Sequence, residues 1–295
     1  MLASGVYPAS VTPFDVRGRV DLAALARVLA WFEASGCRGA VLAGTNGEGP
    51  SLSAVEKRDL LIAAMGVRGS LDLILGVATP SLDEAIWSCK QAHRVGAAAV
   101  LLMAPFYFRD ATEAGIERWF TEVLDASPLP ILLYNFPQKT GIVLSPDLLA
   151  RLAGHDRFSG AKDSSGDPAN LSAYRQAVQP HHALFVGNET LLLDALGLGW
   201  TGTISGAANV IPQWLAAVCE EWSSQRESAE TKFALALAAI EALRAGPQPA
   251  LNKAVLRALG VLPDARVRAP MMECPEVRLD ETLRVLRTTL GIGPA

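Results

Sequence analysis

Three features of the 295-residue sequence predict an α/β fold, namely a (β/α)8 TIM barrel with a C-terminal helical extension. Short β-rich runs alternate with longer helical patterns in one series over roughly 220 residues, the size of such a barrel. The runs are apolar throughout, which is typical of a parallel sheet covered by helices. The connections are short, without a low-complexity linker. A doubly wound sheet is the alternative, but that fold usually has fewer strands and a phosphate-binding loop.

The expected elements follow from these patterns. Strands are expected at residues 6–11, 40–43, 73–77, 98–103, 131–135, 158–162, 184–186 and 201–205. Helices are expected at residues 21–34, from 53, and at 81–95, 112–124, 145–152, 168–178, 189–196 and 212–222. Two of them open with a Ser-x-x-Glu capping box, at Ser53 and Ser81. After residue 222 the pattern is helical only, at 227–245, 249–259 and 279–290. We therefore expect a barrel catalytic domain over residues 1–223 and a helical appendage over 224–295 packed on it.

The composition excludes several classes of protein. Half of the residues are apolar and 19% are charged, so a large core is available and disorder is excluded. The net charge is −4 and no basic stretch is interleaved with aromatic residues, so neither nucleic acid nor an anionic membrane is expected as a partner. Cys37, Cys89, Cys219 and Cys274 are far apart, which predicts free thiols in a reducing compartment. Because the N-terminal residues also lack the features of a signal peptide, we expect a cytoplasmic protein.

Lys162 is the first candidate for chemistry. It closes the sixth expected strand among small residues, and the C-terminal strand ends of a barrel carry its active site. An amine there can lose hydration and act as a nucleophile, although a strand-end lysine can also simply reach solvent. The other lysines are expected in helices with polar neighbours, except Lys139, which is expected in a loop.

Two further strand ends complement this lysine. Tyr134 closes the neighbouring fifth strand, where its phenol can shuttle the protons of imine formation. The loop from Gly44 to Gly47 can present backbone N–H groups and the Thr45 hydroxyl to a carboxylate. A 2-oxo acid held there would form a Schiff base with Lys162, and the imine would serve as the electron sink. Taken singly, Tyr134 could be a barrel-capping aromatic and the loop a tight turn.

The strand ends carry neither a histidine nor a cluster of carboxylates, so no catalytic metal is expected. The covalent lysine imine would take the place of a cofactor. The expected partners are therefore a small 2-oxo acid and an aldehyde.

Five motifs occur in order along the chain. They are Thr12-Pro13-Phe14, Gly44-Thr45-Asn46-Gly47-Glu48, Tyr134-Asn135-Phe136-Pro137, Gly160-Ala161-Lys162-Asp163 and Gly202-Thr203-Ile204-Ser205. Through them nearly the whole sequence resembles the dihydrodipicolinate synthase/N-acetylneuraminate lyase family of class I, Schiff-base-forming aldolases.

The resemblance implies a role for individual positions. Lys162 would form the Schiff base with pyruvate, and Tyr134 would relay protons. Thr45 and Asn46 would hold the pyruvate carboxylate, and Ile204 would line the pyruvate pocket. The strand-end residues Gly187 and Ser205 are further candidates for substrate contact. Tyr107 would join the proton relay of a neighbouring subunit, which implies a homo-oligomer, a dimer or more usually a homotetramer.

Departures from the family pattern bear on the substrate. Lys139 stands where dihydrodipicolinate synthases carry an arginine that grips the carboxylate of the aldehyde, and lysine lacks the bidentate fork. Glu189 is followed by Thr190, where sialic acid lyases carry an acidic pair. The Thr45-Asn46-Gly47-Glu48 loop and the run Lys162-Asp163-Ser164-Ser165-Gly166-Asp167 look closer to the aldolases of 2-keto-3-deoxy sugar acids and 4-hydroxy-2-oxoglutarate.

We therefore expect a lyase that reversibly cleaves a 2-oxo-3-deoxy (sugar) acid or 4-hydroxy-2-oxo acid to pyruvate and an aldehyde. One alternative is a 4-hydroxy-tetrahydrodipicolinate synthase, which condenses pyruvate with aspartate semialdehyde. The second alternative is a catalytically silent barrel that binds a 2-oxo acid.

Overall fold

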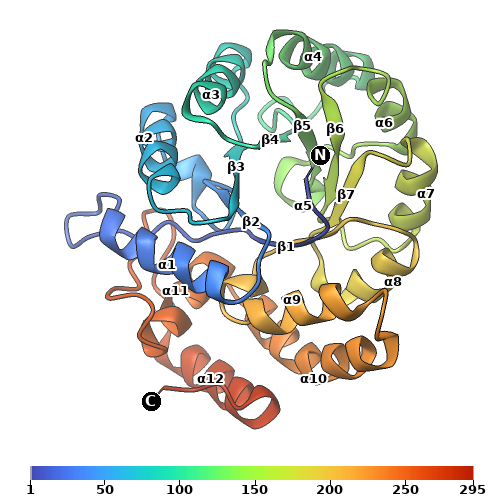
Figure 1. Cartoon of the computed structure of the whole chain (residues 1–295). Helices are drawn as coiled ribbons and strands as arrows, with labels where there is room; N and C mark the ends of the chain where they lie inside the picture. Colours follow the sequence, from blue (N-terminus) through green and yellow to red (C-terminus); the bar gives the residue numbers. More distant parts are fainter. Residues whose placement is uncertain (1, 295) are drawn as a thin grey trace.

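Eight parallel strands curve into a nearly closed barrel in the computed structural model, which describes residues 2–294 (Figure 1). The strands are β1 (Gly5–Pro8), β2 (Gly39–Leu42), β3 (Asp72–Val77), β4 (Ala99–Met103), β5 (Ile131–Asn135), β6 (Phe158–Asp163), β7 (Ala183–Val186) and β8 (Gly202–Ser205). From β2 to β8, strands that follow each other in sequence are paired in the sheet, and β1 pairs with β8. A single bridge between Ala9 and Val41 links β1 to β2. The predicted fold class is confirmed.

Helices surround the barrel (Figure 1). They are α1 (Leu22–Ala34), α2 (Ala54–Met65), α3 (Leu82–Val95), α4 (Glu113–Ala126), α6 (Pro146–Leu152), α7 (Ala169–Ala177), α8 (Leu192–Gly197) and α9 (Pro212–Glu221). The segment expected as one helix over 189–196 is a 3-10 turn, Glu189–Leu191, followed by α8. An additional short helix, α5 (Pro137–Thr140), carries Lys139, which was expected in a loop. Its single turn is too short to produce a recognisable apolar period.

Side-chain caps explain where the helices begin. Ser53 and Glu56 form the expected capping box at the start of α2. At α3 the box is only half formed, because the Ser81 hydroxyl accepts from the Glu84 N–H whereas the Glu84 carboxylate contacts Thr79 and Lys57. The N-caps still satisfy backbone N–H groups that have no partner within their helices.

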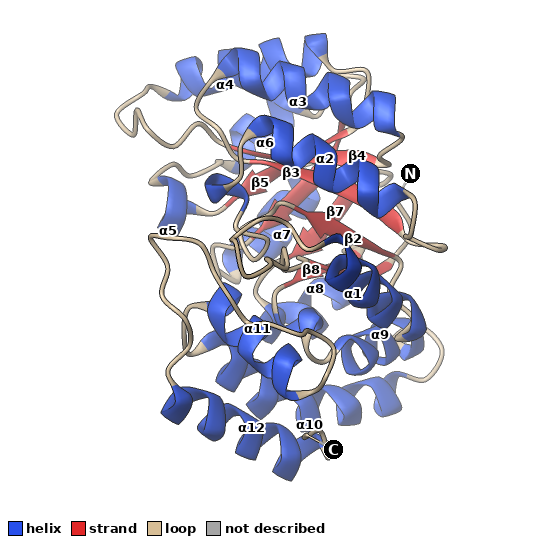
Figure 2. Ribbon diagram, turned by 90° about the vertical axis from the view of Figure 1, so that its left-hand side faces the viewer, coloured by secondary structure: helices blue, strands red, loops and turns tan. Residues whose placement is uncertain are grey.

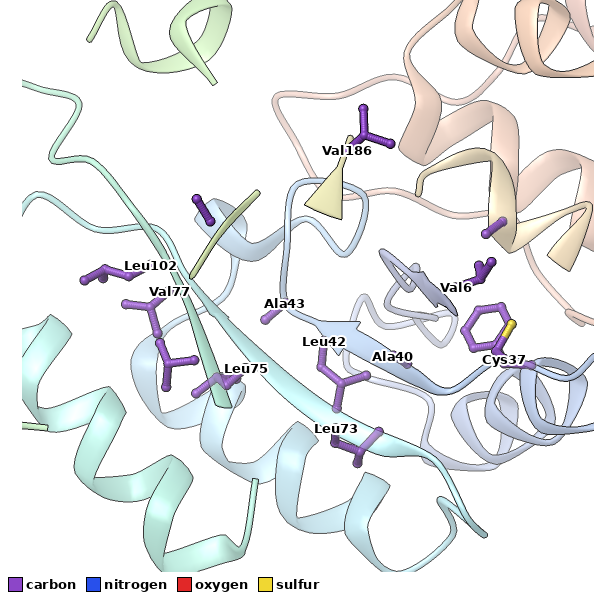
Figure 3. Close-up of a cluster of buried hydrophobic side chains, with 14 of the residues drawn as sticks. Val6, Cys37, Ala40, Leu42, Ala43, Leu73, Leu75, Val77, Leu102 and Val186 are labelled. Carbon is purple, nitrogen blue, oxygen red and sulfur yellow. The ribbon is translucent and has the colours of Figure 1, made fainter. Parts of the chain in front are cut away.

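The strands separate two apolar layers, because successive side chains point to opposite faces. One layer fills the barrel interior and includes Tyr7, Ile74, Tyr134, Phe185 and Ile204. The larger layer lies between the strands and the outer helices, and Figure 3 shows the part of it around β2 and β3. Lys162 pairs in register with Tyr134 on one side and Phe185 on the other. It therefore shares the inward-facing side of the strands.

The C-terminal helices α10 (Arg226–Arg244), α11 (Gln248–Ala258) and α12 (Glu276–Leu290) lie together beside the barrel (Figure 2). Their buried side chains Leu251, Val255, Leu256 and Leu286 belong to the same apolar cluster as the outer layer of the barrel. The predicted appendage thus shares the core of the barrel. Among the described helices, none combines the length and apolar character needed to span a lipid bilayer.

Candidate active site

Lys162 and Tyr134 meet at the C-terminal ends of β6 and β5. The parallel register places the two residues side by side, and Lys162 Nζ donates to the Tyr134 hydroxyl over 3.3 Å. The same nitrogen lies 4.3 Å from the centre of the Tyr134 ring. Both side chains are almost fully buried, with 5% and 4% of their surface exposed. This pair was predicted from sequence, and the geometry allows proton exchange between amine and phenol.

Neighbouring side chains hold this pair in place. The Ser164 hydroxyl lies 3.5 Å from the Tyr134 hydroxyl, and Phe136 stacks on the Tyr134 ring at 5.7 Å. On the outer face, Asn135 Nδ2 donates to Asp163 Oδ1 over 2.7 Å and so ties the end of β5 to that of β6. Burial raises the pKa of Asp163, against the opposing effect of its hydrogen bonds. The tie fixes the strand ends from which the pair projects.

The loop after β2 forms the opposite wall of the site. The Thr12 hydroxyl donates to the Gly47 carbonyl over 2.7 Å. Ala43 and Glu48, which flank the loop, have left-handed φ angles of 53° and 55°. A Cβ atom at Gly47 would lie 2.8 Å from the Ser10 carbonyl oxygen, so only glycine fits there. The backbone strain at Ala43 and Glu48 persists only where the surrounding structure holds the backbone in place, and such strain is typical of ligand-binding loops.

Helix α11 holds the same loop from the other side. Asn252 Nδ2 donates to Asn46 Oδ1 over 3.0 Å and to the Gly206 carbonyl over 2.9 Å. Beneath them Lys253 forms an ion pair with Glu48, and neither side chain is exposed. Burial lowers the pKa of Lys253 to about 8, although the charge of Glu48 opposes the shift. The loop is thus fixed by residues about 200 positions further along the chain.

The expectation of polar surroundings is wrong for two of the helical lysines. Lys253 is fully buried, and Lys57 is 2% exposed in contact with Glu84. Local sequence shows a lysine in a polar helical segment in both cases. It cannot show that another element covers that face of the helix.

These walls enclose a pocket of about 550 Å³ at the barrel mouth. The predicted residues that line it are Thr45, Asn46, Tyr134, Lys139, Lys162 and Gly187. A Cβ atom at Gly187 would lie 2.8 Å from Lys162 Cε and 1.9 Å from Ser164 Oγ, so glycine leaves the lysine its space. The amine, the phenol and the loop therefore face one cavity.

Three predicted residues lie elsewhere. Ile204 is fully buried in the barrel interior, beneath the pocket rather than among its lining residues. Ser205 is also buried, and its hydroxyl donates to Glu189 Oε1 over 2.7 Å. Tyr107 is 74% exposed in the segment between β4 and α4, away from the pocket walls of its own chain. The Ser205 hydroxyl thus supports Glu189, and the expected role of Tyr107 in a neighbouring subunit stays a prediction.

Sequence reasoning missed several residues of the pocket. Ser164 follows Lys162 by two positions, and this proximity was the available signal. Arg244, Gln248 and Met271 come from the C-terminal part that the sequence presents only as an appendage. No local motif marks them, because their position depends on how α10, α11 and the segment between α11 and α12 pack against the barrel.

Comparisons with known proteins show the family of this chain. The family model described as "Dihydrodipicolinate synthetase family" matches residues 2–288. The 4-hydroxy-tetrahydrodipicolinate synthase 1 of Streptomyces coelicolor is 35% identical over 269 residues, which cover 89% of this chain and 86% of that protein.

Solved structures match along nearly the whole chain. YagE, an Escherichia coli prophage protein of the dihydrodipicolinic acid synthase family solved in complex with pyruvate, superimposes with a TM-score of 0.93 at 25% identity, covering 98% of this chain and 99% of YagE. The chloride-inhibited dihydrodipicolinate synthase of Acinetobacter baumannii, also complexed with pyruvate, gives a TM-score of 0.93 at 28% identity and the same coverage. The chain therefore belongs to the dihydrodipicolinate synthetase family, as an enzyme of the class I aldolase type that forms and cleaves carbon–carbon bonds.

Proposed function

We propose that this enzyme forms a Schiff base between Lys162 and pyruvate and reversibly adds the pyruvate methyl carbon to an aldehyde. The addition product is a 4-hydroxy-2-oxo acid, a class that includes the 2-oxo-3-deoxy sugar acids. The observation that carries the proposal is the buried contact of 3.3 Å between Lys162 Nζ and the Tyr134 hydroxyl inside the pocket.

The reaction begins with attack of the Lys162 amine on the ketone carbon of pyruvate. Loss of water from the adduct requires proton transfers, for which the Tyr134 hydroxyl is in reach of the amine and Ser164 is in reach of Tyr134. Removal of a methyl proton then gives an enamine, whose carbon attacks the aldehyde. Hydrolysis of the imine releases the product and restores the lysine, so the cycle needs no cofactor.

The Thr45-Asn46 loop is the proposed site for the pyruvate carboxylate. Within residues 2–294 the Thr45 hydroxyl has no hydrogen-bond partner, and both residues line the pocket opposite Lys162. The Asn46 amide is held by Asn252 and lies 3.5 Å from Gln248 Oε1. Such a fixed set of donors binds an anion at little cost of ordering.

A second candidate is 4-hydroxy-tetrahydrodipicolinate synthase, in which the aldehyde is aspartate semialdehyde. The name of the Streptomyces coelicolor relative supports it. Lys139, in place of the arginine expected for a synthase, supports the lyase. The two candidates share the Schiff base and differ in the aldehyde and in the direction of the reaction.

The first prediction tests the shared step. Borohydride reduction in the presence of pyruvate is expected to leave a stable three-carbon adduct on Lys162, which peptide mass spectrometry locates. Lys162→Ala is expected to lose both adduct and turnover while keeping the far-ultraviolet circular dichroism of the parent. Lys90→Ala, on the outer helix α3, is the control. An unmodified Lys162 at saturating pyruvate would disprove the mechanism.

An aldehyde screen then separates the candidates. Pyruvate consumption with aspartate semialdehyde favours the synthase, and pyruvate release from 2-oxo-3-deoxy sugar acids or 4-hydroxy-2-oxoglutarate favours the lyase. An adduct without turnover on any aldehyde would identify a silent binding barrel.

The cellular setting is part of the same proposal. The four cysteines are free thiols in the structure, which suits the reducing cytoplasm. The exposed Tyr107 suits a homo-oligomer in which a neighbouring copy covers it.

A further inference from the structure

Arg244 extends from the end of α10 to the wall of the pocket. It is the residue before the turn to α11, and about a third of its side chain is exposed (34%). Its Nη1 donates to Glu189 Oε2 over 2.6 Å, and the Gly187 carbonyl lies 3.5 Å away. The C-terminal extension thus supplies a guanidinium to the barrel mouth.

Glu189 fixes this arginine from below. Its carboxylate is fully buried and accepts from the Ser205 hydroxyl over 2.7 Å and from the Ala207 N–H over 3.0 Å. Burial raises the pKa of Glu189, but the charge of Arg244 together with these hydrogen bonds brings it below its ordinary value. Glu189 is therefore an anion at neutral pH, and it holds Arg244 through one nitrogen.

The other edge of the guanidinium is available to a ligand. In the described part of the chain, Arg244 Nε and Nη2 have no hydrogen-bond partner. These two nitrogens form the planar fork that binds a carboxylate through two parallel hydrogen bonds. Gln248, the first residue of α11, also lines the pocket, and its Nε2 is buried without a partner among residues 2–294.

Gly187 links this fork to the reacting lysine. Its carbonyl faces Arg244, and its missing side chain faces Lys162 Cε, at 2.8 Å from an ideal Cβ position. The Gly187 carbonyl oxygen and the ideal Cβ position of the same residue lie about 3 Å apart. Arg244 Nη1 is therefore within about 10 Å of Lys162 Cε. A short aldehyde joined to a lysine-bound pyruvate spans such a distance.

The charges around the pocket also favour an anion. Glu48 is the only acid among the described residues that line the pocket, and it is already paired with Lys253. Glu189, which lies outside the lining, is paired with Arg244. Lys139 lines the same pocket and has no ion-pair partner within residues 2–294. An added anion therefore finds cations without competing acids.

We propose that Arg244 binds an anionic group on the aldehyde partner, so that the enzyme selects short aldehydes bearing a carboxylate. This assignment rests on the proposed function and narrows it. Aldehyde acids are favoured over the neutral polyol aldehydes that sugar acids release. A phosphate group shares the chemistry, and the experiment below separates the two.

The test compares aldehydes of equal length with and without the anion, at saturating pyruvate. The pairs are 4-oxobutanoate with butanal, and glyceraldehyde 3-phosphate with glyceraldehyde. Arg244→Leu is expected to lower kcat/KM for 4-oxobutanoate roughly 10- to 100-fold, because hydrogen bonds to a charged group contribute binding energy of that size. The kcat/KM for butanal, which has no anionic group, is expected to change by less than about threefold. A loss confined to the phosphate pair would assign the site to phosphate and overturn the carboxylate assignment. Equal losses for charged and neutral aldehydes would overturn the proposal.

Two variants guard against a structural explanation. Because Arg244→Leu leaves Glu189 buried without its partner, the double variant Arg244→Leu/Glu189→Gln is measured beside it and should show the same loss of selectivity. Arg226→Leu removes the arginine at the other end of α10, which pairs with Glu230, and should leave the selectivity unchanged. Loss of selectivity in Arg226→Leu would contradict a specific role for Arg244.

A binding measurement separates this inference from the proposed function. The adduct of pyruvate at Lys162 is trapped with borohydride, and the trapped protein is titrated with succinate and with butyramide. Succinate is expected to bind the parent at least tenfold more tightly than Arg244→Leu, whereas butyramide should not distinguish them. If no adduct forms, the proposed function fails, but the same titration of the unmodified protein still decides the role of Arg244. Equal succinate affinity in parent and variant would overturn that role.

Discussion

Two buried lysines in this chain differ in the partner that each one faces. Lys253 faces the carboxylate of Glu48, whereas Lys162 faces the phenol of Tyr134. A buried ammonium matched to a carboxylate is held as an ion pair and is unavailable to a ketone. A phenol can both accept and return a proton, so it supports an amine that must change its protonation during the reaction. Burial alone therefore does not identify the nucleophile, but the identity of the partner does.

Tyr134→Phe is the prediction that follows at the residue scale. Removing the hydroxyl leaves the ring, its stacking on Phe136 and the pocket shape in place. Formation of the pyruvate imine is expected to slow by roughly 10²-fold or more, because the proton relay is lost. Stopped-flow measurement of imine formation, with Ser164→Ala for comparison, checks the effect. Imine formation at the parental rate would remove Tyr134 from the mechanism.

At the element scale, strands and C-terminal helices differ in how far the sequence predicts them. Lys162, Tyr134 and Thr45 were found because a strand end is a local feature, and a barrel brings all strand ends together. Arg244 and the buried state of Lys253 were missed because both depend on packing between α10 or α11 and loops over fifty residues away in the chain. Sequence patterns state which face of a helix is polar, but not which element covers it.

Lys253→Met tests the support that α11 provides to the Glu48 loop. The substitution leaves the Glu48 carboxylate buried without its ion-pair partner, which costs about 3–5 kcal/mol of unfolding free energy in other proteins. Denaturant unfolding measures the change, and the KM for pyruvate is expected to rise because the loop loses its anchor. The double variant Lys253→Met/Glu48→Gln should recover much of the stability, because no charge is then left unpaired. Equal destabilisation by the single and double variants would contradict this account.

At the scale of the whole molecule, ion pairs as well as apolar contacts join the C-terminal extension to the barrel. Arg268 donates to Glu56 on α2 and to the carbonyls of Gly18 and Ser51. Hydrogen bonds from Arg268 lower the pKa of Glu56 from 4.5 to about 2. The pKa in the folded state is the lower one, so the contribution of this pair is complete above about pH 4.5 and is lost as the pH falls towards 2.

This pair yields a pH-dependent prediction. The unfolding free energy of the parent should fall between pH 4.5 and 2 more steeply than that of Glu56→Gln, which has no carboxylate to protonate. Thermal unfolding at a series of pH values in this range measures both slopes. Glu122 forms an ion pair with Arg118 on the exposed face of α4, and Glu122→Gln is the control. Its unfolding free energy should fall with pH as steeply as that of the parent. Parallel curves for the parent and Glu56→Gln would show that the pair contributes nothing.

The shared core further predicts that barrel and extension unfold together. All six tryptophans lie at or before Trp222, so fluorescence reports on the barrel and on its border with α10, where Arg226 lies over the Trp222 ring. Far-ultraviolet circular dichroism also reports on the rest of α10 to α12. Leu286 on α12 is fully buried in the cluster that it shares with the barrel, so Leu286→Ala is expected to cost about 2–5 kcal/mol. Both signals should shift to lower temperature by the same amount, although the substitution lies outside the barrel. Leu235→Ala, at a site 49% exposed on α10, should shift neither.

A fall in helicity before any change in fluorescence would instead make residues 224–295 a separate unit. The guanidinium of Arg244 would then reach the pocket from a part able to detach.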